Sequence, residues 1–189
     1  MSTTLAINRR RQRSKAGIGM PGNNDAILAL ARRLRTQVDA AVLGGIAVHL
    51  HGVSRATVDL DLYSTDRKRT AEQLESAGAR WHKSAREHVL DGVPIHTITP
   101  EDAGVTVEKT SVIDGVRVVT LKDLVAIKLI SGLKNPARSK DLGDVESLIR
   151  EIPLDKRFAG KLPKNIRAEF KAMVDAVRVA NHNSSDRRF

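Results

Sequence analysis

The hydrophobic pattern of this sequence changes its period at about residue 120. Before that point, short apolar runs alternate with helical segments, and residues 57–63 alternate strictly between polar and apolar side chains. After it, apolar residues recur at helical spacing over 121–133, 138–151 and 163–180. The change predicts a fold of the α/β class (α+β): a small mixed sheet flanked by helices, with further helices at the C-terminus.

Turn and capping residues divide the first half into elements. Helices are expected over 23–39, 46–51 and 66–77, with Asn23 or Asn24 as the first N-cap. A short apolar segment at 41–43 precedes Gly44. Asp91-Gly92 and Asp114-Gly115 each separate two apolar runs, which predicts two hairpins with type I′ turns, 86–90 with 93–98 and 111–113 with 116–119.

Half of the net charge lies in the first 22 residues. The chain has 189 residues and a formal charge of +10, and residues 1–22 carry five basic and no acidic side chains. We therefore expect a disordered basic tail at 1–22, a core at 23–120, a helical part packed on it at 121–182 and a short tail at 183–189. A second interpretation is that Met20 is the true initiator.

Composition excludes several functional classes. The sequence contains no cysteine, which excludes disulfide scaffolds, thiolate catalysis and cysteine-ligated metals, and fits a cytoplasmic protein. Its apolar runs are far shorter than the roughly 20 residues of a membrane span, and no signal peptide is visible. The positive charge favours nucleic acid over a membrane surface as partner. Five aromatic residues are too few for a base-stacking platform.

Two glycines and two aspartates form the pattern that points to chemistry. Gly44-Gly45 precedes a short helix, where a backbone free of side chains can approach a phosphate. Asp59 and Asp61 lie two apart on a predicted strand, so their carboxylates face the same side, roughly 6–7 Å apart along the chain. Such a pair can hold Mg²⁺ on a triphosphate. Together they are the minimum equipment for nucleotidyl transfer.

The same residues resemble a known signature. Gly44-Gly45 followed by Arg55-x-Thr57-x-Asp59-x-Asp61 is similar to the motif of the DNA polymerase β-like nucleotidyltransferase superfamily, and most similar to its AbiEii-type toxin and minimal nucleotidyltransferase group. The stretch from Arg138 to Asp144 resembles that group's R-x-K-D-x-x-D motif. The resemblance spans about residues 27–150. It implies a nucleotidyltransferase-like sheet, an NTP substrate, Mg²⁺ or Mn²⁺, an RNA acceptor such as tRNA, and a cognate antitoxin.

The resemblance also implies roles for single residues. Asp59 and Asp61 would bind metal, and the phosphate-binding and catalytic set would include Gly44, Gly45, Arg55, Lys128, Arg138, Asp141 and Asp144. Lys128 lies on the apolar stripe of its helix, so it needs a partner: it either contacts nucleotide phosphates or is a boundary lysine. Asp141 and Asp144 could pair with it. Asp141 also fits a helix cap.

One position departs from the superfamily pattern. A third carboxylate usually lies on a following strand, and in the best register His96 occupies that position. A neutral histidine can accept a proton, but it is a poorer ligand for Mg²⁺ than for Mn²⁺. Two alternatives therefore stay open: a catalytically degenerate nucleotide- or RNA-binding module on the same fold, and a small-molecule (antibiotic) nucleotidyltransferase. A zinc site built from the other histidines lacks any ligand spacing.

Overall fold

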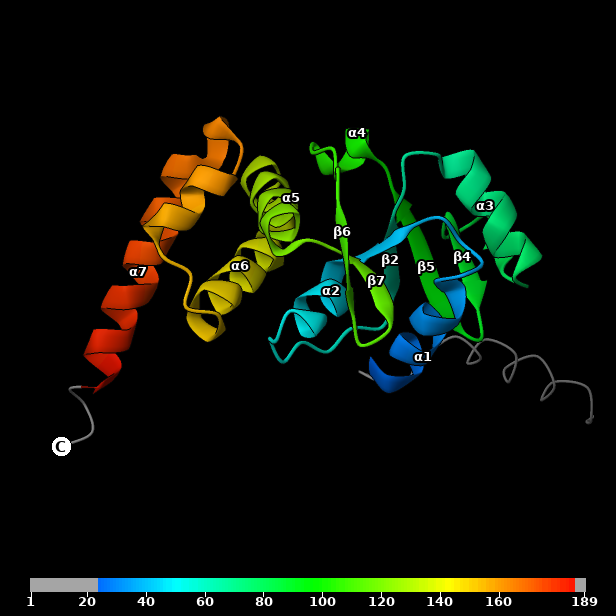
Figure 1. Cartoon of the computed structure of the whole chain (residues 1–189), viewed down its shortest axis with the longest axis horizontal. Coiled ribbons are helices and arrows are strands. Elements are labelled where there is room, and N and C mark those ends of the chain that lie inside the picture. The colour runs from blue at the N-terminus through cyan, green and yellow to red at the C-terminus, as the bar shows by residue number, and fades with distance from the viewer. Residues whose placement is uncertain (1–23, 186–189) are drawn as a thin grey trace, which may run out of the picture.

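A mixed sheet runs through the centre of the molecule (Figure 1). The computed structural model describes residues 24–185, and within them seven strands follow the order β3-β4-β5-β2-β1-β7-β6. The strands are β1 (Ala41–Leu43), β2 (Leu60–Tyr63), β3 (Arg80–His82), β4 (Glu87–Leu90), β5 (Val93–Ile98), β6 (Thr110–Ile113) and β7 (Val116–Val119). The helices are α1 (Asn24–Leu34), α2 (Gly44–Leu50), α3 (Arg67–Ser76), α4 (Pro100–Ala103), α5 (Leu121–Lys134), α6 (Ser139–Glu151) and α7 (Arg167–Ser185). Three 3₁₀ turns, Pro136–Arg138, Lys156–Lys161 and Lys164–Ile166, join the last helices.

The central strands bring separate parts of the sequence together. β1 pairs antiparallel with β2 and parallel with β7, and β2 pairs parallel with β5. The two predicted hairpins are confirmed as β4–β5 and β6–β7. Both Asp-Gly pairs have positive φ at each residue, as a type I′ turn requires: 53° and 79° in the first, 48° and 76° in the second.

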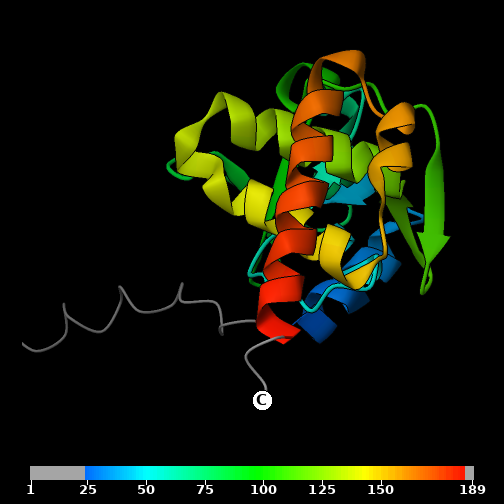
Figure 2. The ribbon, with the colours of Figure 1, turned by 90° about the vertical axis from the view of Figure 1, so that its left-hand side faces the viewer.

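Helices cover both faces of this sheet. α1 and α3 lie on one side, and α5, α6 and α7 lie together on the other (Figures 1 and 2). Val42 and Leu62 are opposite each other on β1 and β2, are buried, and line a small cavity with residues of α1. The fully buried Phe170 of α7 packs 5.5 Å from the ring of Phe158. Apart from the buried Tyr63, the rest of the core is aliphatic, as the composition predicts. The predicted fold class is confirmed.

The strand predicted to carry both aspartates begins three residues later than predicted, so it contains Asp61 but not Asp59. Residues 57–59 do not pair with a neighbouring strand, and Val58 is 54% exposed instead of facing the core. Asn24 explains the difference, because its side chain donates to the Arg55 carbonyl at 2.7 Å and accepts from the Thr57 N–H at 3.2 Å. The start of α1 therefore holds this segment, and β2 pairs only from Leu60 onward.

Other boundaries also differ from the predicted ones. α1 ends at Leu34, before the predicted 39, and the last helix begins with a 3₁₀ turn and continues to Ser185, past the expected boundary at 182. The pattern did not predict α4 or β3. All three residues of β3 are exposed, and its Trp81 ring lies 4.9 Å from the His88 ring on β4.

Two further expectations concern the N-terminal tail and membrane-spanning segments. The expected tail at 1–22 lies outside the residues that the structure describes. No helix in residues 24–185 combines the length and the apolar character that crossing a membrane requires.

Candidate functional site

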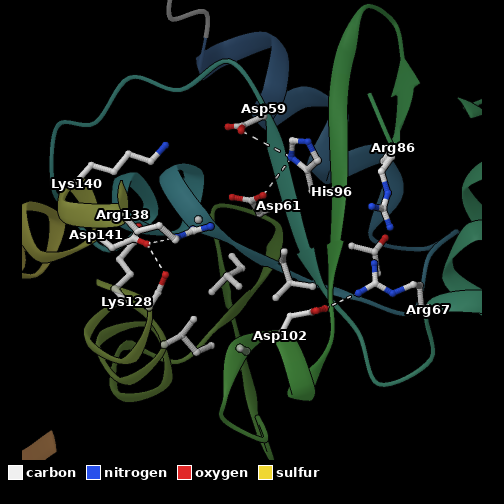
Figure 3. Close-up of a pocket in the computed structure, with 17 residues that line it drawn as sticks. Asp59, Asp61, Arg67, Arg86, His96, Asp102, Lys128, Arg138, Lys140 and Asp141 are labelled. Carbon is white, nitrogen blue, oxygen red and sulfur yellow. Dashed lines mark hydrogen bonds and ion pairs between the residues drawn. The ribbon is translucent and has the colours of Figure 1, made fainter. Parts of the chain in front are cut away.

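Asp59, Asp61 and His96 converge at the junction of β2 and β5 (Figure 3). His96 lies directly opposite Asp61 in the parallel register of the two strands. Its Nδ1 atom is 3.4 Å from Asp61 Oδ1 and 3.8 Å from Asp59 Oδ2. Both carboxylates therefore lie on the side of His96, the residue that the sequence suggests for the third position.

Close backbone packing positions the two aspartates. A Cβ atom on Gly44 would lie 1.9 Å from Asp61 Oδ2, and Gly44 has a φ of +66°. Both the lack of space and the backbone conformation therefore require glycine at this position. A Cβ on Gly45 would lie 2.8 Å from the Cβ of Thr57. The Thr57 hydroxyl donates to Asp59 Oδ1 at 2.6 Å. The missing side chain of Gly44 therefore leaves space for Asp61, and that of Gly45 leaves space for Thr57.

Glu87 holds His96 from the other side. Glu87 Oε2 lies 3.0 Å from His96 Nε2, so the imidazole lies between the carboxylate of Glu87 on β4 and those of Asp59 and Asp61. The hydrogen bond to Asp61 is the largest cause that raises the pKa of His96 to about 9, and Glu87 and the charge of Asp59 add to it against the opposing effect of burial. Without a bound cation, His96 is therefore an imidazolium at neutral pH.

A buried ionic cluster joins α5 to α6 beside the aspartates. Lys128 Nζ lies 2.9 Å from Asp141 Oδ1 and 2.7 Å from Asp144 Oδ2, and all three side chains are less than a tenth exposed. Arg138 and Ser131 donate to the second oxygen of Asp141, each at 2.8 Å. Burial acts to raise the pKa of Asp141, but the Lys128 charge and these hydrogen bonds outweigh it and hold the pKa below its usual value.

The same cluster reaches the segment before the aspartates. Arg55 Nε donates to Asp144 Oδ1 at 2.8 Å, so Arg55 ties α6 to the approach of β2. Asp144 thus lies between Lys128 and Arg55. The pairing of Lys128 with both aspartates, which the sequence left open, is what the structure has.

A cavity of about 530 Å³ opens over the aspartates (Figure 3). Of the residues singled out in the sequence, it is lined by Gly44, Asp59, Asp61, His96, Lys128, Arg138 and Asp141. Gly45, Arg55 and Asp144 are not part of its lining. Their contacts are with Thr57 and with the ionic cluster, so they support the residues that line the cavity.

Sequence reasoning missed several residues of this site. The cavity is also lined by Arg67, Arg86, Asp102 and Ser131, which no motif marked, and by Lys140, which lies in the R-x-K-D-x-x-D motif but was given no role. Glu87 was missed as well, although a signal for it existed. The two-residue Asp91-Gly92 turn pairs Leu90 with Val93 and His88 with Ile95, and the next position of that register places Glu87 opposite His96.

The donor set fits a divalent cation. Within residues 24–185, Asp59, Asp61 and His96 are the one group of three histidine, cysteine or acidic side chains whose ligand atoms all lie within 4.8 Å of one another. Two carboxylate oxygens suit Mg²⁺, and the imidazole nitrogen makes the set a better match for Mn²⁺. His51 is not part of it, because its Nε2 lies 2.9 Å from the Val119 carbonyl.

Three solved structures, from two organisms, share the fold of this chain. An antigenic nucleotidyltransferase-like protein from Paracoccidioides brasiliensis matches with a TM-score of 0.50 and 18% identity, over 88% of this chain and 94% of that one. The fold is nucleotidyltransferase-like. A nucleotidyltransferase candidate from Helicobacter pylori matches with a TM-score of 0.53 and 13% identity, over 85% and 96% of the two chains. The protein JHP933 from H. pylori gives 0.53 and 13%, over 86% and 93%.

Comparisons at the level of sequence give no match. No protein-family model and no curated protein matches this chain. At 13–18% identity, the structural likeness establishes the fold alone. The chemistry depends on the residues of the site.

Proposed function

We propose that this protein is a divalent-metal-dependent nucleotidyltransferase that moves a nucleoside monophosphate from an NTP to a hydroxyl group of an RNA acceptor. The observation that carries the proposal is the convergence of Asp59, Asp61 and His96 beside Gly44, in a cavity that also contains the ionic cluster of α5 and α6. The nucleotidyltransferase-like fold supports the same reaction class.

The residues divide the work of binding the nucleotide. Asp59 and Asp61 would hold Mg²⁺ or Mn²⁺, with His96 as third donor, and a bound ion supplies charge neutralisation of the triphosphate. Gly44 leaves backbone exposed at the wall of the cavity, where a phosphate can approach. Arg138 and Lys140 line the cavity beside α6 and lie on the side where the β- and γ-phosphates would be bound.

The reaction joins the acceptor oxygen to the α-phosphorus of the NTP. The bond between the α-phosphorus and its bridging oxygen breaks, and pyrophosphate leaves with the electron pair. The acceptor hydroxyl loses its proton to water, because His96 Nδ1 faces the aspartates as the third donor to the ion while Glu87 holds Nε2. Lys128 contributes through position, because its charge is already shared between Asp141 and Asp144.

The proposal is tested by transfer of labelled nucleotide. Wild type is incubated with each α-labelled NTP, Mg²⁺ or Mn²⁺, and total RNA, beside Asp59→Asn and the control Asp25→Asn. Asp25 is exposed on the first turn of α1 and is not part of the cavity lining, so its substitution removes the same charge outside the cavity. We expect label in RNA with wild type and Asp25→Asn only. Absence of transfer by wild type, or equal transfer by Asp59→Asn, contradicts the proposal.

A toxin role with a cognate antitoxin is part of the proposal, since the motif from Arg138 to Asp144 resembles that of AbiEii-type toxins. Its test is growth of cells that express wild type, Asp59→Asn or Asp25→Asn. Growth arrest by wild type and Asp25→Asn alone supports it, and arrest by Asp59→Asn contradicts a catalytic toxin.

One observation favours a second candidate, a nucleotide-binding module without catalysis. The imidazolium of His96 already neutralises part of the charge of Asp59 and Asp61 without a metal. Substitution of His96 by Asp restores the third carboxylate. Transfer activity that appears in His96→Asp and is absent from wild type identifies a degenerate enzyme.

A further inference from the structure

Two groups of cationic side chains lie at opposite ends of the cavity, with the aspartate pair between them. Arg138 approaches from the 3₁₀ turn before α6 and Lys140 from α6 itself, whereas Arg67 and Arg86 approach from α3 and the β3–β4 turn (Figure 3). The nucleotide assignment above uses only the first group. The second group has no role in binding the NTP.

The two arginines differ in how they are held. Arg67 is paired with Asp102, whose carboxylate also accepts from the backbone N–H and hydroxyl of Thr99. These hydrogen bonds, first of all that from the Thr99 backbone, hold the pKa of Asp102 below its usual value, so this carboxylate is a fixed anchor. A guanidinium carries five N–H donors, and Arg67 is half exposed, so donors remain free for a ligand.

Arg86 has no counter-ion. Within residues 24–185 its side chain makes no ion pair, although it lies at a cavity wall beside another arginine. Its backbone adopts a φ of +56°, in the left-handed region that favours glycine. A strained, unpaired arginine at a cavity wall is the kind of feature that function explains better than stability does.

The geometry of nucleotidyl transfer indicates which ligand would lie at the end of the cavity near Arg67 and Arg86. The attacking and leaving oxygens lie roughly in line through the reacting phosphorus. If pyrophosphate leaves toward Arg138 and Lys140, the acceptor hydroxyl must approach from the opposite side. That side carries His96, held by Glu87, and Arg86 is the residue directly before Glu87.

We propose that Arg67 and Arg86 form an acceptor subsite that binds the phosphodiester next to the reacting 3′ hydroxyl of an RNA strand. This inference rests on the proposed function for the assignment of the two ends. A planar guanidinium binds two phosphate oxygens at once, which fixes the position of a terminal nucleotide. A cationic acceptor such as an aminoglycoside would be repelled here, so the subsite favours a polynucleotide over that class of small molecule.

Equilibrium binding tests the subsite without requiring turnover. Affinity for a fluorescein-labelled, unstructured RNA decamer is measured by anisotropy at fixed ionic strength for wild type, Arg86→Gly and Arg67→Ala. Arg69→Ala and Arg80→Ala are the matched controls, since both arginines are exposed on α3 and β3, outside the cavity lining. We expect losses of about tenfold or more for the first two variants and about twofold or less for the controls.

Arg86→Gly separates binding from folding. Glycine adopts a φ of +56° without strain, so the melting temperature of Arg86→Gly should equal or exceed that of wild type while its RNA affinity falls. Equal affinity of Arg86→Gly and wild type, or equal losses in Arg69→Ala and Arg86→Gly, overturns the subsite.

Competition identifies the bound group. A dinucleoside monophosphate, which carries one phosphodiester, should displace the decamer from wild type, whereas the same concentration of adenosine should not. Displacement by adenosine, or by inorganic phosphate as effectively as by the dinucleotide, contradicts recognition of a phosphodiester. If the selective loss in Arg86→Gly occurs but wild type transfers no label, the subsite stands and the catalytic proposal fails.

Discussion

At the scale of single residues, Gly44 is the position at which substitution should be tolerated least. A Cβ would overlap Asp61 Oδ2, and the φ of +66° disfavours any other residue. We expect Gly44→Ala to abolish detectable Mn²⁺ binding by isothermal titration and to lower stability by about 1–3 kcal/mol in urea unfolding.

Gly143→Ala is the matched control, because no atom lies within 4 Å of the added Cβ on α6. Its stability should rise by about 0.5–1 kcal/mol. Wild-type Mn²⁺ affinity in Gly44→Ala contradicts the prediction.

His96 should make the stability of the metal-free protein depend on pH. Its pKa is raised to about 9 in the folded protein, against 6.5 for the free side chain, so the folded state binds the proton more tightly. The stabilisation is complete below about pH 6.5 and is lost as the pH rises through about 9. Urea unfolding in EDTA at pH 6 and pH 9.5 measures it.

The control for this pH dependence is His96→Gln, which cannot carry the charge. We expect wild type to lose more stability than His96→Gln between the two pH values, by a modest amount because the side chain is 36% exposed. An equal loss in both proteins contradicts the assignment of an imidazolium between Glu87 and the aspartates.

At the scale of elements, Lys128 is the link between α5 and α6. Its removal leaves Asp141 and Asp144 buried with fewer partners, and breaking a buried pair in this way costs about 3–5 kcal/mol. We therefore expect Lys128→Met to lower the free energy of unfolding by that amount. Lys140→Met removes an exposed lysine of α6 and should change it by about 0.5 kcal/mol or less. Similar losses in both variants contradict a structural role for the cluster.

The sequence predicts those elements whose pattern reflects burial. The Asp-Gly turns identify both hairpins, and the alternation around Leu60 and Leu62 identifies the strand that carries Asp61. β3 escapes prediction because all of its residues are exposed, which leaves no alternation to detect. The start of β2 was predicted wrongly because a distant side chain, that of Asn24, binds the preceding segment.

The site is predictable to the extent that it lies within one segment. Asp59 and Asp61 lie two residues apart in one extended segment, so the spacing alone predicts that their carboxylates share a side. Arg67 and Arg86 meet at the cavity only because β5 pairs beside β2 and β4 beside β5, a strand order that local patterns do not encode. Glu87 is an intermediate case for prediction, because the length of the Asp91-Gly92 turn sets its register with His96 on the neighbouring strand.

At the scale of the whole molecule, the first residues carry half of the net charge. Deletion of residues 1–19 removes five positive charges, so the salt dependence of RNA binding should weaken. If all five contact single-stranded RNA, the slope of log K against log salt falls by about 3–4. The measurement is RNA affinity across a range of salt concentrations for both proteins. Binding of the NTP should not change, and an unaltered slope shows that this segment does not contact RNA.

The contact between the tilted rings of Trp81 and His88 gives the protein an optical reporter of its own. Trp81 is the sole tryptophan of the chain, half exposed on β3, and His88 follows Glu87 on β4. Any ligand that moves the β3–β4 turn changes the surroundings of this indole. The intrinsic emission should therefore respond when RNA binds at Arg86, without a label, and the response should disappear in Arg86→Gly.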